Sequence, residues 1–200
     1  IAWWRHSERS SKTRHVLQVL PFAIVAVAAG LTTGWLEVHH LQAYGPEFGW
    51  TALQRVFIAT HALWFYAGKM ILPVGLAFVY PRWGVDPALV GPWVHVAMTV
   101  AAFVALIVFR KKVPAGVTVG LASYVVMIAP ALGLTNIYFM RFSFAQNHFQ
   151  YFAGMAGAAL IGAGLWKLAQ RFGAADSVRS VAAAGVVVAL LAAGCVREGL

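Results

Sequence analysis

Five apolar runs, each close to the length of a membrane-spanning helix, divide this chain. A helix needs about 20 mainly apolar residues to cross the hydrocarbon core of a bilayer. The pattern therefore predicts an all-α polytopic membrane protein with about five transmembrane helices. Pro21 and Pro130 fall inside two of the runs and predict kinks. The predicted spans are 16–36, 92–109, 114–134, 152–168 and 180–196.

The segment 51–80 has a different pattern, that of an amphipathic helix. Thr51 and Gln54 have the spacing of a capping box, which predicts a helix start here. Polar and small residues fall on one face and large apolar residues on the other, so we expect an interfacial helix that does not cross the membrane. The first face carries Thr51, Arg55, Ala59, Ala62, Tyr66 and Lys69, and the second carries Leu53, Phe57, Trp64 and Ile71.

Composition supports a membrane protein. The chain is 61% hydrophobic and 10% charged, and its mean hydropathy is +0.75, whereas soluble domains carry about 25% charged residues. Its net charge of +9 comes from short basic clusters between the apolar runs, so nucleic-acid binding is not expected. The single cysteine, Cys195, excludes an intrachain disulfide framework and a multi-thiolate metal site.

The basic clusters also predict an orientation. By the positive-inside rule they face the cytoplasm, so the N-terminal end is cytoplasmic and the C-terminal end is outside. The segments 37–91 and 135–151 then face the outer side. A single crossing by 51–80 would place the second cluster outside, against this rule. The clusters are Arg5, Arg9, Lys12 and Arg14, then Arg110, Lys111 and Lys112, and finally Lys167, Arg171 and Arg179.

Small residues repeat every four positions on two of the predicted spans. Gly30 and Gly34 follow Ala26 in the first span, and Gly154 and Gly162 flank Ala158 in the fourth. Such ridges let transmembrane helices approach closely. We therefore expect these faces to pack against neighbouring helices.

The two outer segments collect polar, cationic and aromatic side chains. This mixture suits an anionic amphiphile, because Arg binds phosphate through paired donors and Lys through a point charge. For any single residue the alternative is an anchor at headgroup depth. The strongest local signal is the loop 141–151, whose polar groups lie at the mouth of the predicted bundle.

No metal or other cofactor is expected. His39 and His40 are adjacent, so they diverge by about 100° on a helix, and no HxxxH or HExxH spacing accompanies them. The sequence also contains no glycine-rich phosphate loop and no Ser-His-Asp order.

Six short motifs occur in a fixed order and carry a family resemblance. The chain resembles the bacterial relatives of the transmembrane and tetratricopeptide-repeat O-mannosyltransferases, which are multispanning glycosyltransferases of the GT-C type. The likeness covers nearly the whole chain. The motifs are WWR at 3–5, LPF at 20–22, ALWFYAGK at 62–69, YPRW at 80–83, RFSF at 141–144 and HFQY at 148–151.

The resemblance implies an enzyme of the bacterial inner membrane that transfers a sugar from a polyprenyl-phosphate donor to an acceptor at the outer face. Its catalytic aspartate would lie in an outer loop upstream of Ile1, and its repeats would follow the last span. We therefore expect a single membrane domain over 1–200 that is the C-terminal membrane part of a longer protein. Its partners would be the bilayer, the lipid donor, and the missing N-terminal half and repeats. Alone, this part should be inactive.

The resemblance also assigns roles to residues of the outer segments. Lys69, Arg82 and Arg141 would bind the donor phosphate, because the leaving group gains charge during transfer. His61 stands where members tend to carry Arg, and Asn147 stands where they tend to carry Asp. The predicted pocket residues are His61, Tyr66, Asn147, His148, Gln150 and Tyr151.

Two alternatives stay open at this point. A transporter or flippase for a lipid-linked anion would place charged groups inside several spans, whereas His95 near the end of one span is almost the only polar candidate. A non-catalytic scaffold would use the same outer loops only to anchor a repeat domain. A missing aspartate in the upstream loop would favour the scaffold.

Overall fold

The computed structural model describes residues 12–171, with side chains from residue 17 onward. Within this range the regular elements are helices, apart from an isolated antiparallel bridge between Val79 and Gln146. The all-α prediction is therefore confirmed for the described residues. The predicted fifth span, 180–196, lies outside them.

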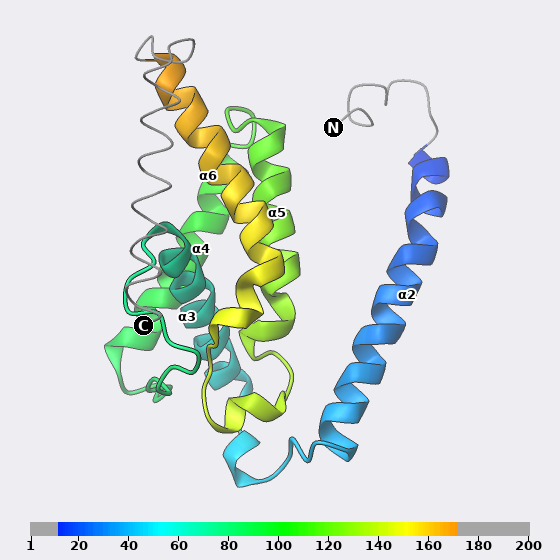
Figure 1. Ribbon diagram of the computed structural model, residues 1–200, viewed down its shortest axis with the longest axis vertical. Coiled ribbons are helices and arrows are strands. Elements are labelled where there is room, and N and C mark those ends of the chain that lie inside the picture. Colours follow the sequence, from blue (N-terminus) through cyan, green and yellow to red (C-terminus); the bar gives the residue numbers. More distant parts are fainter. Residues whose placement is uncertain (1–11, 172–200) are drawn as a thin grey trace. The chain divides into compact units, whose positions relative to one another are not determined.

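Within residues 12–171, four helical stretches are long and apolar enough to cross a membrane, as an integral membrane protein requires (Figure 1). They match the first four predicted runs and extend some of them by several residues. Pro21 lies inside the first helix, whereas Pro130 lies in a 3-10 turn that continues the third. The stretches are α2 (Lys12–His39), α4 (Val90–Val108), α5 (Ala115–Ile128) with η2 (Ala129–Leu132), and η4 (Asn147–Gln150) with α6 (Tyr151–Arg171).

The described chain forms two compact units. The first unit consists of residues 12–49 and Thr135–Arg141 and contains α2 with the short helices η1 (Pro46–Phe48) and η3 (Tyr138–Arg141). Within it, the Tyr138 amide donates to Glu37 Oε2 at 2.8 Å. The second unit consists of residues 50–134 and 142–171. A single membrane domain over 1–200 stays a prediction.

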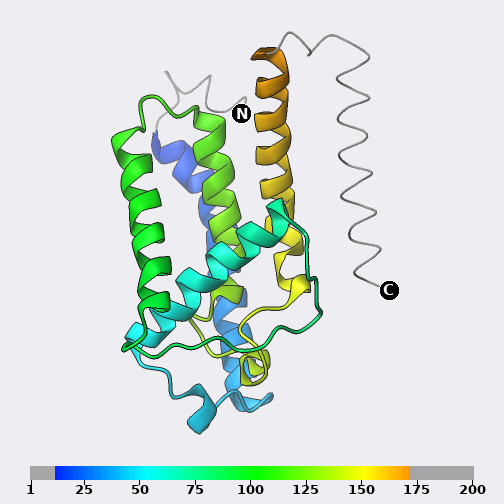
Figure 2. The same cartoon turned by 90° about the vertical axis from the view of Figure 1, so that its left-hand side faces the viewer.

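In the second unit, α4, α5 and α6 run up, down and up, and α3 (Ala52–Ile71) crosses them obliquely (Figure 2). Helix α3 begins at the end of the unit where α4 also begins, and residues 72–89, here called the return segment, bring the chain back to that end. The turn 109–114 and the end of α6 lie at the opposite end. The helix at 51–80 is therefore present, and its interfacial position stays a prediction.

The predicted start of α3 is confirmed. The Gln54 amide donates to Thr51 Oγ1 at 3.3 Å, and the Thr51 amide donates to Gln54 Oε1 at 2.9 Å, which completes the capping box. The face that the sequence marks as polar is buried at Ala59, Ala62 and Tyr66. It packs against η2 and α6, because small residues allow the close approach of helices.

We expect Thr51→Ala to lower the free energy of unfolding by about 1 kcal/mol, because the substitution removes the oxygen that accepts from the Gln54 amide. Denaturation of the purified chain in mixed detergent micelles, followed by circular dichroism, measures this change. Thr51→Ser retains the hydroxyl and should restore most of the loss. Equal destabilisation by both variants would argue against the cap as the cause.

Candidate functional site

Aromatic side chains from three segments of the second unit are in contact. The rings of Phe65 on α3 and Tyr80 on the return segment lie 4.7 Å apart, and Phe65 and Trp83 lie 5.9 Å apart. Trp83 in turn lies 5.3 Å from Phe144, which lies 5.4 Å from Trp50. These five residues are called the aromatic cluster. It joins α3, the return segment and the loop 142–150 into one surface.

Arg82 lies over one side of this cluster. Its guanidinium carbon is 5.3 Å from the ring centre of Trp50 and 5.2 Å from that of Phe144. The side chain is exposed. Cation–π contacts of this kind are worth about 0.5–1 kcal/mol at exposed sites, and they fix the direction of the guanidinium without neutralising its charge.

Lys69 lies over two other rings of the cluster. Its ammonium nitrogen is 5.5 Å from the ring centre of Phe65 and 5.3 Å from that of Tyr80. It also donates to the carbonyl oxygens of Val74 and Gly75, the latter at 2.9 Å. An ammonium group has three donors, so two of them hold the turn at the end of α3. The structural role of Lys69 was not predicted.

The third predicted phosphate ligand belongs to the other unit. Arg141 lies in the first unit, where its Nε donates to Glu47 Oε1 at 2.9 Å. Both side chains are partly exposed, at 49% and 30%, so the pair contributes at most about 1 kcal/mol to stability. Of the predicted three, Lys69 and Arg82 lie in the second unit, and each contacts two rings of the aromatic cluster.

Tyr66 connects α3 with the loop 142–150. Its hydroxyl donates to the Gln146 carbonyl at 3.3 Å and accepts from the Gln146 amide at 3.0 Å. The side chain is fully buried, and this burial raises the pKa of the Tyr66 phenol to about 12. The hydroxyl therefore stays protonated at neutral pH and acts as a structural donor and acceptor.

Asn147 and Tyr80 form a second connection to the same loop. The Tyr80 hydroxyl donates to Asn147 Oδ1 at 2.8 Å and accepts from the Ala77 amide at 2.9 Å. The Tyr80 amide also donates to the Ala145 carbonyl at 3.4 Å. An amide oxygen accepts this bond as a carboxylate would, so Asn147 provides the acceptor that an aspartate at this position would also provide.

The other predicted pocket residues do not gather at one point. His61 stacks on Trp83 at 4.2 Å, whereas His148 stacks on Phe78 at 5.1 Å. Gln150 is partly buried, and Tyr151, the first residue of α6, is 70% exposed. The predicted pocket residues therefore lie in different places: beside the aromatic cluster, in the loop 142–150 and at the exposed start of α6.

The prediction missed the burial of Gln146 in the loop. Gln146 is 1% exposed, and neither Oε1 nor Nε2 of its side chain has a hydrogen-bond partner among the described residues. A glutamine in a polar loop carries no sequence signal for burial. Gln146 is buried because its backbone carbonyl and amide bond to the buried Tyr66 hydroxyl.

An open groove borders Lys69. It has a volume of about 460 Å³ and is lined by the C-terminal half of α3 and the following turn. Its wall at Trp64 is fixed by a bond from the indole N–H to Thr99 Oγ1 at 2.9 Å. The groove offers apolar surface beside one cation. Its lining residues are Trp64, Phe65, Gly68, Lys69, Ile71, Leu72 and Val74.

Among residues 12–171, no three His, Cys, Asp or Glu side chains are placed so that they could hold a metal ion. The described site is therefore one of cations, aromatic rings and amide groups.

No protein family model, no curated protein and no solved structure matches this chain.

Proposed function

We propose that this chain is the membrane part of a glycosyltransferase that takes a sugar from a polyprenyl-phosphate donor at the outer membrane face. One observation carries the proposal, together with the family motifs. Arg82 and Lys69 lie over one continuous aromatic cluster, beside the loop 142–150. Cations on an apolar surface suit the junction between a phosphate and a hydrocarbon chain.

The chemistry of sugar transfer uses such an arrangement. When the glycosidic bond to the donor breaks, the departing polyprenyl phosphate gains negative charge. Arg82 would bind this charge through paired donors, and the third donor of Lys69 would add a point charge. The groove beside Lys69 would receive the first part of the hydrocarbon chain.

Tyr66, Tyr80 and Asn147 would act as positioning residues. Their bonds hold the loop 142–150 against α3 and the return segment, and they thereby set the place of Phe144 under Arg82. The catalytic aspartate that the resemblance implies would come from the upstream loop. On this proposal the 200-residue chain binds the donor but does not transfer the sugar.

The distribution of charge in the second unit supports an outer position for the site. The turn with Arg110, Lys111 and Lys112 and the end of α6 with Lys167 and Arg171 lie at the end opposite to the start of α3. By the positive-inside rule that end would be cytoplasmic. Reaction of Lys111→Cys, in a Cys195→Ser background, with an impermeant thiol reagent added to intact cells would contradict this orientation.

Donor binding by the chain in lipid nanodiscs tests the proposal. We expect Arg82→Ala to weaken the binding of a polyprenyl monophosphate about tenfold to a hundredfold, because a hydrogen bond to a charged group contributes about 1.5–3 kcal/mol. Native mass spectrometry at several ligand concentrations gives the dissociation constant. The affinity of the variant decides whether Arg82 belongs to the site.

The matched control is Lys112→Ala, which removes one positive charge at the opposite end of the unit and should leave the affinity within about twofold of the parent chain. To test Lys69 in the same assay, Lys69→Arg is preferable to Lys69→Ala. Alanine would also remove the ammonium group that holds the turn at Val74 and Gly75. Equal binding by Arg82→Ala and Lys112→Ala would remove Arg82 from the proposed site.

A further inference from the structure

Three rings from three different segments form a continuous stack in the second unit. His61 of α3 lies 4.0 Å from the His95 ring of α4, with an angle of 9° between the planes. On its other side it lies 4.2 Å from the Trp83 ring of the return segment, at 26°. His61 is therefore the middle layer of a Trp–His–His stack.

The outer layers of the stack are held by other contacts. His95 Nδ1 lies 3.0 Å from the Gly91 carbonyl oxygen in the first turns of α4. Trp83 also packs on Phe65 and Phe144. His61 thus joins a ring fixed on α4 to a ring fixed in the aromatic cluster, and it fastens the return segment to both helices.

We propose that this stack is a pH-sensitive latch, which holds the return segment while His61 is neutral and releases it when His61 gains a proton. Neutral rings stack face to face at these distances. A charged imidazolium would instead be held in partly desolvated surroundings and against a second histidine ring. The inference goes beyond the proposed function, because it requires no donor and no transfer reaction.

The direction of the pH effect follows from the surroundings of His61. Burial, and then the nearby His95, lower the pKa of His61 from 6.5 to about 4. In the released state the His61 imidazole has its ordinary pKa, so it binds a proton more readily than in the closed latch. The latch is closed above about pH 6.5, and its closure weakens as the pH falls toward 4. Attraction of the charged ring to Trp83 opposes this trend but does not reverse it.

Among the described residues, the helices around His61 carry no Asp or Glu that could stabilise its charge. Helix α3 packs on α4, η2 and α6, and α4 contributes His95 as its titratable residue. The η2 sequence APAL contains no titratable residue. Helix α6 carries Tyr151, Lys167 and Arg171 near its two ends.

The return segment and α3 itself add further groups. Arg82 lies over Trp50 and Phe144, and Asp86 Oδ1 accepts from the Ala88 amide. On α3, Arg55 Nη1 donates to the Gly133 carbonyl at 3.5 Å. The remaining titratable side chains of this face, Tyr66 and Lys69, are bonded to the loop and to the turn.

The latch would also act on the cation site. Trp83 follows Arg82 directly in the chain and contacts Phe144, the ring beneath the guanidinium. Release of Trp83 would therefore free Arg82 from its fixed position. Acidification of the outer medium would loosen this part of the site before the core of α4, α5 and α6 is affected.

Hydrogen exchange of the 200-residue chain in lipid nanodiscs tests the latch. Exchange of peptides that cover residues 79–86 is followed by mass spectrometry from pH 7.5 to 4.5 and corrected for the intrinsic rate at each pH. We expect protection to fall about tenfold per pH unit between 6.5 and 4.5, as linkage to one proton requires. A pH-independent protection factor would overturn the proposal.

Two variants identify the group that titrates. His61→Phe keeps a flat ring in the stack and should remove the pH dependence, whereas His148→Phe, a histidine of the same unit outside the stack, should retain it. A pH dependence that persists in His61→Phe would overturn the proposal. If His61→Phe does not fold, His95→Phe provides the test. Loss of the neighbouring histidine should raise the pKa of His61 in the closed latch, so the pH dependence of protection should end at a higher pH. An unchanged profile in His95→Phe would exclude the paired stack.

Discussion

Replacement of Tyr66 by phenylalanine should lower the free energy of unfolding by about 1–3 kcal/mol. The hydroxyl accepts from the Gln146 amide at 3.0 Å and donates to the Gln146 carbonyl at 3.3 Å, in a fully buried position. Without it, the Gln146 amide is left buried and unpaired among the described residues, which costs about 1–3 kcal/mol. The Gln146 carbonyl still accepts from the Phe149 amide at 3.1 Å. The phenyl ring keeps the packing, so little of the loss would come from a cavity.

Unfolding of the variant by sodium dodecyl sulfate in mixed micelles, monitored by circular dichroism, measures this effect. Tyr151→Phe is the matched control, since it removes the same hydroxyl from a residue that is 70% exposed. We expect the control to change the free energy of unfolding by less than about 0.5 kcal/mol. If the two variants were equally stable, the bonds of Tyr66 to the loop would contribute nothing to stability.

The spans and the start of α3 could be predicted from the sequence because both depend on neighbouring residues. Apolar runs of membrane length give α2, α4, α5 and α6 within several residues of their ends. The Thr51 and Gln54 spacing gives the cap, since its bonds join residues three apart. Pro130 was expected to kink a span. The α-helix instead ends at Ile128 and continues as a 3-10 turn, because proline cannot donate to the preceding turn.

The connections of the candidate site could not be predicted, because they join residues far apart in the sequence. Tyr66 and Gln146 are 80 positions apart, and Tyr80 and Asn147 are 67 apart. Neither the loop nor α3 contains a local pattern that specifies the pairing. The ion pair of Arg141 with Glu47 also joins residues far apart in the sequence. The role of Arg141 as a phosphate ligand stays a prediction.

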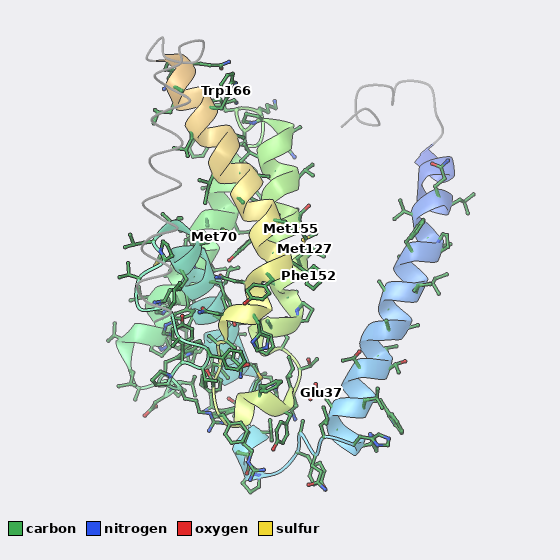
Figure 3. The ribbon with its side chains drawn as sticks, viewed as in Figure 1. Glu37, Met70, Met127, Phe152, Met155 and Trp166 are labelled. Carbon is green, nitrogen blue, oxygen red and sulfur yellow. The ribbon has the colours of Figure 1, made fainter. Side chains whose placement is uncertain are left out.

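The face of α6 that packs was also not the one that the small-residue pattern indicated. A β-carbon added to Gly154 or Gly162 would meet none of the described residues within 4 Å. The side chain of Met70, on the side of α3 that faces α6, instead lies against Gly157 (Figure 3). Periodicity shows that a helix has a smooth face, but the shape of the neighbouring helix decides which face is covered.

Gly120→Ala should destabilise the contact between α5 and α6 by about 1–3 kcal/mol. A β-carbon at this position would lie 2.6 Å from Leu160 Cδ2 and 2.8 Å from Leu160 Cγ. The second distance involves the branch point of the side chain, so a rotation of the terminal methyl groups alone does not relieve the clash. Overpacking of this size forces a shift of the helix or an unfavourable rotamer. Mixed-micelle unfolding measures the loss.

The same helix provides the control for this prediction. Gly116 lies one turn earlier on α5, and in the described part of the chain no atom lies within 4 Å of a β-carbon added there. Gly116→Ala should therefore be neutral or stabilising by up to about 1 kcal/mol, because alanine loses less conformational freedom in a helix. In a double-mutant cycle, Leu160→Ala should remove the penalty of Gly120→Ala, with a coupling energy of about 1 kcal/mol or more. Additive effects of the two substitutions would mean that Gly120 and Leu160 do not determine how closely α5 and α6 approach.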